Sequence, residues 1–198
     1  MIIRKANTAD LGSIMLMYKS CVKGMLKNGI DQWDESYPNA DIILTDIKAR
    51  TYFIAELNGE ILGGINLDEK QDPTYLTIGW EDKTNNFLVV HRLAVKEENW
   101  GGSIGKELML FVEEVVIEEG YQSIRLDTYS GNPKAIEFYR RLGYTELGTI
   151  DLKANKNKYH CFEKNHKMRN LSFLIILSSF ACNHPTENTL ILYRKRFG

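Results

Sequence analysis

A glycine-rich turn between two apolar segments is the first candidate binding site in the sequence. It reads Trp100-Gly101-Gly102-Ser103-Ile104-Gly105 and is followed by Lys106. Segment 87–95 before it is typical of a buried strand, and segment 104–119 after it has helical apolar spacing. A glycine turn entering a helix presents unpaired N–H groups at the positive end of the helix dipole, which suits a phosphate or pyrophosphate. An ordinary loop is the alternative, because the spacing matches neither a P-loop nor the dinucleotide-binding fingerprint.

A second group of residues opens another predicted helix about thirty positions later. Segment 132–144 reads NPKAIEFYRRLGY, in which Asn132 and Pro133 are typical of an N-cap and a first helical position. Tyr139 follows two turns later, near the same side of the helix. A tyrosine hydroxyl can give a proton to a leaving group whose pKa is close to its own. A core tyrosine and a simple helix cap are the alternative interpretations of these two residues.

Taken together, these segments resemble the acetyl-CoA-binding core of the GNAT superfamily of N-acetyltransferases. The resemblance rests on HRLAV (91–95), the turn WGGSIG with its helix, and NPKAIEFYRRLGY, and it covers about residues 1–165. It implies direct transfer of an acetyl group from acetyl-CoA to a primary amine of a small molecule or a protein. No acyl-enzyme forms in that reaction, so no nucleophilic cysteine is needed.

The resemblance also assigns roles to individual residues. Leu93, Ala94 and Val95 would hold the pantetheine arm by backbone hydrogen bonds, on a strand whose bulge opens the cleft. The pyrophosphate would be held by the turn from Trp100 to Lys106. This turn includes Gly101, Gly102, Ser103, Ile104 and Gly105. Asn132 would contact the cofactor, and Tyr139 would protonate the departing CoA thiolate.

Two positions of the turn depart from the family pattern. Trp100 stands where the family usually has Gln or Arg, and Ser103 stands where it usually has glycine. The Ser103 hydroxyl could donate to the phosphate, or it could cap the helix and compete for the same N–H groups. These departures motivate a rival function, a CoA-binding or regulatory module without turnover.

The acceptor amine must lose a proton before it attacks, so a general base is expected. His91 is the first candidate because the ordinary pKa of histidine is suitable, with a hydrogen-bonded core histidine as the alternative. Asp127, Glu81 and Asp82 are the other candidates. Trp33 and Tyr37, in the polar connector 32–40, are expected as walls of the acceptor site or as aromatic side chains that cap the core.

The remaining pattern predicts the elements that position these residues. A hairpin is expected over 52–57 and 60–67, because Asn58-Gly59 favours a tight turn. Further strands are predicted at 2–6, 87–95, 123–129, 144–152 and 158–162, and helices at 11–26, 41–50, 104–119 and 133–142. The predicted fold class is α/β (α+β), with a mixed, mostly antiparallel central sheet of about seven strands flanked by about four helices. The resemblance implies a GNAT-like acyl-CoA N-acyltransferase fold for residues 1–166.

Composition restricts the class of protein further. The chain has 198 residues, 43% hydrophobic and 26% charged, which is typical of one globular domain. A net charge of −1 argues against a nucleic-acid partner bound by bulk positive charge. Three widely separated cysteines support neither a disulfide framework nor a metal site. With no N-terminal targeting pattern, we expect a cytoplasmic enzyme without a metal. The resemblance allows a homodimer, as many members of the superfamily are dimers.

Residues 167–198 do not follow this alternation of strands and helices. They include the apolar run 171–182, which is shorter than the ~20 residues that span a bilayer. Three interpretations stay open: an additional packed element, a sequence acquired by fusion or read-through, and a contact with a membrane or a partner. We expect no membrane association of the domain itself.

Overall fold

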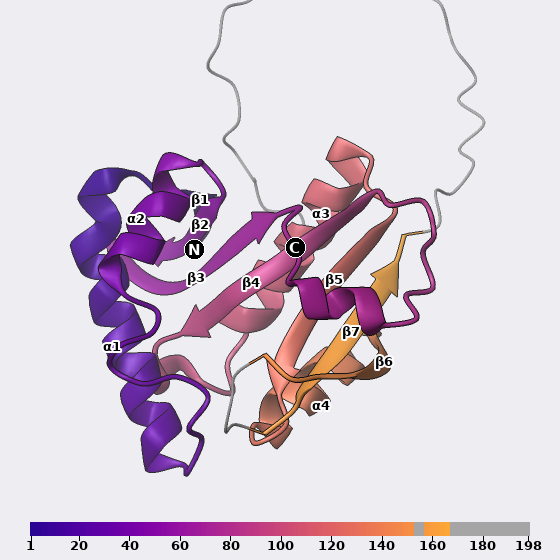
Figure 1. The fold of residues 1–198 in the computed structure, drawn as a ribbon. Helices are drawn as coiled ribbons and strands as arrows, with labels where there is room; N and C mark the ends of the chain where they lie inside the picture. The colour runs from indigo at the N-terminus through magenta and orange to yellow at the C-terminus, as the bar shows by residue number, and fades with distance from the viewer. Residues whose placement is uncertain (153–156, 167–198) are drawn as a thin grey trace, which may run out of the picture. The chain divides into compact units, whose positions relative to one another are not determined.

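A seven-stranded sheet forms the centre of the fold. The computed structural model describes residues 1–152 and 157–166. Within these residues the strand order is β1-β2-β3-β4-β5-β7-β6, and β4 and β5 are the one parallel pair of neighbours (Figure 1). The strands are β1 (Ile2–Lys5), β2 (Tyr52–Leu57), β3 (Glu60–Asp68), β4 (Phe87–Val95), β5 (Ser123–Tyr129), β6 (Thr145–Ile150) and β7 (Tyr159–Asn165).

Four α-helices cover the two faces of this sheet (Figure 1). They are α1 (Leu11–Lys27), α2 (Ala40–Lys48), α3 (Ile104–Glu119) and α4 (Pro133–Arg141), joined by short 3-10 helices η1 (Thr8–Asp10), η2 (Pro73–Thr77) and η3 (Glu97–Asn99). The apolar residues of α1 and α2 share one core with Tyr52, Ile54 and Val89 of the sheet. Those of α3 and α4 share a second core with Leu88 and Val90 on the opposite face. Strand β4 is therefore buried on both faces, as its continuous apolar sequence predicts.

A bulge and a strand separation shape the middle of the sheet. Between β3 and β4, Gly64 pairs with Ala94 but Asn66 pairs with His91, so β4 contains one extra residue. Arg92 lies in this bulge with a left-handed φ of 52°. The parallel pairing of β4 with β5 ends at Val90 and Leu126, whereas β7 pairs with β5 along its whole length, on the side away from β4. The final residues of β4 therefore have no strand partner on their β5 side.

The predicted fold class, the seven strands and the four helices are confirmed, with small corrections at the ends. Helix α2 stops at Lys48 rather than residue 50, and Arg50 has a left-handed φ of 61° that cannot continue a helix. Strand β7 extends to Asn165, because its whole length pairs with β5. The polar stretch 68–83 contains η2, capped by Asp72.

The C-terminal prediction cannot be followed in the structure. Residues 167–198, including the apolar run 171–182, lie outside the described residues. Among residues 1–152 and 157–166, no helix is long and apolar enough to cross a membrane.

Candidate active site

A cavity of about 500 Å³ lies where β4 and β5 separate. Both strands run toward the edge of the sheet at which α3 and α4 begin (Figure 1). The bulged strand β4 contributes Val90, His91, Arg92 and Leu93 to the cavity wall, and β5 contributes Asp127 and Thr128. Asn132 and Tyr139 come from the start of α4 and its second turn, and Trp33 and Tyr37 come from the connector before α2. Seven of the residues singled out from sequence therefore line one cavity: His91, Leu93, Asp127, Asn132, Tyr139, Trp33 and Tyr37.

Tyr139 lies in the wall of this cavity on the face covered by α4. Its side chain is 6% exposed and packs against Phe138, Tyr144 and Phe162. Burial raises the pKa of the Tyr139 phenol, and the charge of Asp127 raises it further. No described residue forms a hydrogen bond with its hydroxyl. Because its pKa is raised, the hydroxyl keeps its proton at neutral pH. The residue is both a core tyrosine and a candidate proton donor.

Asp127 of β5 contributes a carboxyl group to the cavity wall. Tyr75 of η2 donates a hydrogen bond of 2.6 Å to its Oδ2 atom. Burial raises the pKa of Asp127, although this hydrogen bond opposes the shift. Oδ1 has no hydrogen-bond partner among the described residues, so the Tyr75 hydroxyl gives this half-buried carboxyl its one side-chain hydrogen bond there, and a positive charge on His91 would also stabilise its anion. Glu81 and Asp82, the other acidic candidates, do not line the cavity.

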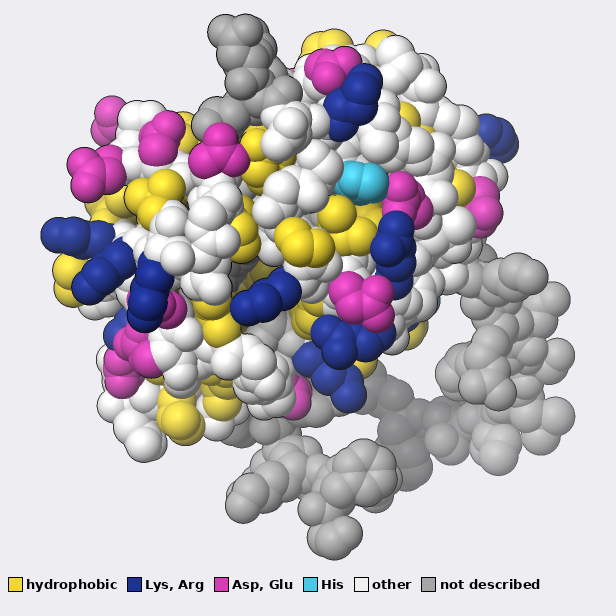
Figure 2. Space-filling model, turned by 90° about the horizontal axis from the view of Figure 1, so that it is seen from below, with side chains coloured by type: hydrophobic (Ala, Val, Ile, Leu, Met, Phe, Trp, Pro, Cys, Tyr) yellow, Lys and Arg dark blue, Asp and Glu magenta, His cyan; other side chains and the backbone are white. Residues whose placement is uncertain are grey.

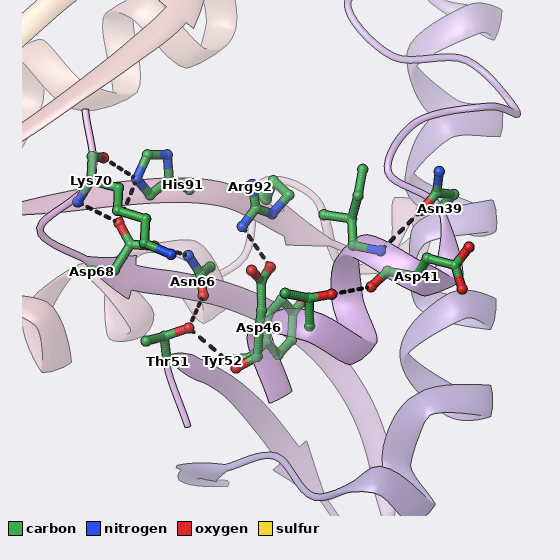
Figure 3. A network of polar contacts seen from close by, with 12 residues as sticks. Asn39, Asp41, Asp46, Thr51, Tyr52, Asn66, Asp68, Lys70, His91 and Arg92 are labelled. Carbon is green, nitrogen blue, oxygen red and sulfur yellow. Dashed lines mark hydrogen bonds and ion pairs between the residues drawn. The ribbon is translucent and has the colours of Figure 1, made fainter. Parts of the chain in front are cut away.

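The β4 bulge is held in place by two tyrosines and an ion pair. Tyr18 donates a hydrogen bond of 2.8 Å to the Arg92 carbonyl oxygen, and Tyr52 donates one of 2.9 Å to the Tyr18 hydroxyl. The Arg92 guanidinium lies 2.5 Å from Asp46 of α2 (Figure 3) and is hydrogen-bonded to Tyr37. Trp33 packs edge-on between Tyr18 and Tyr37 and is buried. Tyr37 therefore contacts the bulged strand β4 directly, and Trp33 packs against the two tyrosines that contact it.

The predicted pyrophosphate turn lies outside the lining of this cavity but beside α4. An added Cβ on Gly105 would lie 3.5 Å from the ring of Phe138, the neighbour of Tyr139. Ser103 stands at the N-cap of α3, and its side chain makes no capping hydrogen bond, so it does not compete for the N–H groups there. No described residue accepts from the backbone N–H of Ser103, Ile104, Gly105 or Lys106. These four donors meet the positive end of α3.

The Trp100 side chain is directed into the protein and not toward that helix start. Its indole N–H donates a hydrogen bond of 2.8 Å to the Val95 carbonyl oxygen. Its ring packs against α1, where a Cβ on Gly24 would come within 2.7 Å of it. Trp100 therefore ties the end of β4 to the turn and to α1.

Charges of both signs are mixed on the face that carries the start of α3 and α4. Figure 2 views this face and shows Lys and Arg side chains on both sides of its centre, between acidic and hydrophobic ones. Lys106 and Lys134 stand in the first turns of α3 and α4. Positive charge is therefore available near the helix starts despite the net charge of −1.

Asn132 acts as the N-cap of α4, as its sequence context predicts. Its Oδ1 atom accepts from the Ala135 N–H at 3.1 Å, and its amide nitrogen donates to Gln32 at 3.4 Å. The oxygen is thus already engaged, and the amide nitrogen faces the connector that carries Trp33.

Sequence reasoning missed several residues of the cavity wall. Lys70, Gln71, Asp72 and Tyr75 come from the polar stretch after β3, whose only sequence signal is its mixture of aromatic and polar residues. Arg92 was missed because its exposure depends on the bulge. No group of three His, Cys, Asp or Glu residues in the described part of the chain could hold a metal ion.

Comparisons with known proteins agree with this geometry. The chain is 26% identical over 157 residues to the N-acetyltransferase YesJ of Bacillus subtilis, covering 78% of this chain and 84% of the relative. Its fold is similar to a GNAT acetyltransferase of Streptococcus agalactiae, with a TM-score of 0.72 and 22% identity, over 84% of this chain and 95% of that one. It is also similar to the PaiA N-acetyltransferase of Thermoplasma acidophilum in complex with coenzyme A, with a TM-score of 0.64 and 20% identity, over 83% and 98% of the two chains.

The match to a family model covers the region that contains β4, α3 and α4. That model, described as the acetyltransferase (GNAT) family, matches residues 21–144, more than half of the chain. The chain therefore belongs to the GNAT family of acetyltransferases.

Proposed function

We propose that this protein transfers the acetyl group of acetyl-CoA to a primary amine of a small molecule or a protein. One observation carries the proposal. The cavity between the separated ends of β4 and β5 has Tyr139 in its wall and lies beside a helix start with unpartnered N–H groups. An acyl donor could bind with its anionic tail at this helix start, and an amine could reach its acyl group in the cavity.

The residues present fit coenzyme A. The N–H groups from Ser103 to Lys106, with Gly101 and Gly102 before them, suit a pyrophosphate at the start of α3. The backbone of Leu93, Ala94 and Val95 suits the pantetheine arm, because β5 has left this edge of β4. The Val95 carbonyl already accepts a hydrogen bond from Trp100, so we assign Trp100 to holding the turn. The other backbone groups of this segment are assigned to the pantetheine arm. The coenzyme A in the PaiA structure supports this choice of ligand.

When bound, acetyl-CoA supplies the thioester carbonyl that the amine attacks. His91 removes one proton from the acceptor ammonium and passes it to solvent, which leaves the nitrogen lone pair free to form the new C–N bond. Tyr139 donates a proton to the sulfur as the C–S bond breaks. Tyr139 regains a proton from the nitrogen as that nitrogen becomes an amide. The products are the N-acetylated amine, the CoA thiol and one released proton.

Asp127, Trp33 and Tyr37 are assigned to the acceptor. Desolvation makes the Asp127 carboxylate costly, and it accepts one hydrogen bond, from Tyr75, so a protonated amine in the cavity would compensate its charge. The Trp33 and Tyr37 rings offer apolar walls and π faces that also suit a cation. We assign the activity to the cytoplasm, where the free thiols of Cys21 and Cys161 would stay reduced.

The first test is a thermal-shift titration with acetyl-CoA, followed by measurement of CoA thiol release over a panel of primary amines. A ligand at 100 times its Kd stabilises a fold by about 2.7 kcal/mol, which raises Tm by several degrees. A saturable rise in Tm together with amine-dependent thiol release supports the proposal. Saturable binding without thiol release would indicate the non-catalytic module, and no rise at millimolar acetyl-CoA would contradict CoA binding altogether.

A further inference from the structure

His91 is held by two hydrogen-bond acceptors on one of its ring nitrogens. Its Nε2 atom lies 3.0 Å from Asp68 Oδ1 and 2.9 Å from the Lys70 carbonyl oxygen (Figure 3). A carbonyl and a carboxylate can only accept, so Nε2 carries a hydrogen in either protonation state of the ring. In the neutral ring the lone pair is therefore on Nδ1. No described residue forms a hydrogen bond with Nδ1.

Asp68 is itself fixed by the sheet. Its Oδ1 accepts from the Lys70 N–H at 2.9 Å, and its Oδ2 accepts from the amide of Asn66 at 3.2 Å. Asn66 is 0% exposed and accepts from the Thr51 hydroxyl at 2.6 Å (Figure 3). Burial opposes the charge of Asp68, but the hydrogen bond from His91 and these other donors lower its pKa. The carboxylate thus keeps one position and a negative charge beside the imidazole.

Charged groups from four parts of the fold face His91. Asp68 and Lys70 come from the end of β3 and the residues after it, Arg92 from β4, Asp46 from α2 and Asp127 from β5. Arg92 is paired with Asp46. Asp68 is the carboxylate in direct contact with the ring, so it has the largest effect on a positive charge formed there.

His91 also lies where two cavities meet. It lines the 500 Å³ cavity that contains Tyr139 and a second cavity of about 390 Å³ between α2 and the ends of β3 and β4. Lys70 and Arg92 line both as well. The imidazole therefore borders both spaces.

We propose that Asp68 is the positioning residue of an Asp68–His91 dyad in which Nδ1 is the proton-accepting atom. This inference rests on the proposed function. In the step concerned, an N–H bond of the acceptor ammonium breaks and an Nδ1–H bond forms. The Nε2 hydrogen stays between Asp68 and Lys70, and the carboxylate stabilises the resulting imidazolium. Asp68 does not take up the proton.

The dyad predicts a particular kinetic defect for the Asp68→Asn variant. Asn keeps the size and an acceptor oxygen but removes the charge that stabilises the imidazolium formed when His91 takes up the proton. We expect kcat to fall about tenfold. KM for acetyl-CoA should stay unchanged, and Asp68→Glu should recover most of kcat.

Asp72→Asn is the matched control, because Asp72 lines the same cavity but caps η2 and does not contact His91. It should leave the hydrogen of the neutral His91 ring on Nε2. A wild-type kcat in Asp68→Asn, or the same change of tautomer in Asp72→Asn as in Asp68→Asn, would overturn the dyad.

A measurement without turnover separates the dyad from the proposed function. Nitrogen NMR of the histidine rings, with His91→Gln to assign the signal, reports which nitrogen carries the hydrogen. We expect the Nε2–H form in the neutral ring of the wild type and a larger share of the Nδ1–H form in Asp68→Asn, because the carboxylate that accepts from Nε2 is gone. An Nδ1–H form would overturn the dyad even if acetyl transfer is found. The expected spectra without acetyl transfer to any amine would overturn the proposed function and leave the dyad standing.

Discussion

Tyr139 combines packing and chemistry in one side chain. Its ring contacts Phe138, Tyr144 and Phe162, while its hydroxyl belongs to the cavity wall. The rings fix its position. Burial raises the pKa of its phenol, so the hydroxyl stays protonated and can donate when negative charge forms on the sulfur.

For Tyr139→Phe we expect kcat to fall about 10²-fold or more, because the proton donor is lost. The ring packing is kept, so Tm and the Kd for acetyl-CoA should change little. Steady-state kinetics and calorimetry check the two parts separately. A wild-type kcat would contradict the role of Tyr139 as proton donor.

Gly105 tests the predicted pyrophosphate site at the start of α3. Gly105→Glu places a negative charge at the positive end of the helix, so we expect acetyl-CoA binding to be lost. Gly105→Ala is the control for folding, since its Cβ would meet Phe138 at an ordinary 3.5 Å. Its Tm should equal or exceed that of the wild type. If calorimetry gives Gly105→Glu the wild-type affinity for acetyl-CoA, the pyrophosphate does not bind at the start of α3.

Single residues show where sequence reasoning ends. The helix cap formed by Asn132 was predictable, because Asn132 and the following Pro133 are local signals within one turn of helix α4. The Asp68–His91 contact joins residues 23 positions apart, and it follows only from the antiparallel register of β3 and β4. The bond from Trp100 to Val95 could not be foreseen, because it depends on how closely α1 approaches at Gly24.

At the scale of elements, the bulge in β4 depends on a close approach between β2 and β3. A Cβ on Gly64 would lie 2.4 Å from the Tyr52 hydroxyl, whose hydrogen bond to Tyr18 supports Arg92. Tyr52 is 0% exposed and has little room to move. Glycine at position 64 therefore lets the two tyrosines reach the bulge.

We expect Gly64→Ala to destabilise the fold by about 1–3 kcal/mol, the usual cost of overpacking a buried site. Gly12→Ala is the matched control, because nothing lies within 4 Å of its added Cβ and alanine favours the helix. Denaturant unfolding measures both variants. Equal stability of the two would show that Tyr52 moves aside without cost.

The elements themselves were predictable to within a few residues, because apolar periodicity and turn residues act locally. The hairpin at Asn58-Gly59 and the helix stop at Gly120 are examples, with left-handed φ at Asn58, Gly59 and Gly120. The place where β4 and β5 separate was not predictable from the residues. It depends on where the parallel pairing of β4 with β5 stops, at Val90 and Leu126, a register between segments 36 residues apart.

At the scale of the whole molecule, buried carboxyls set opposing trends of stability with pH. Asp10, beside Arg4, and Asp68, beside His91, have lowered pKa values, and they contribute stability that is lost as pH falls below about 4. Asp127 behaves in the opposite sense, because burial raises its pKa. The folded state binds its proton more tightly than the unfolded state, so its contribution is greatest at low pH and decreases as pH rises.

Asp127→Asn should therefore raise Tm at pH 8 and lose this advantage toward pH 4. Asn cannot ionise but can still accept from Tyr75, so the cost of a buried charge disappears while the hydrogen bond is kept. A gain of about 1 kcal/mol at pH 8 corresponds to about 2–4 °C in a domain of this size. Differential scanning calorimetry across this pH range checks the trend. The same variant should bind a cationic amine more weakly, so that added amine stabilises the wild type more than Asp127→Asn. A Tm difference that does not depend on pH would mean that the carboxyl is protonated throughout, and then Asp127 could not attract the acceptor by charge.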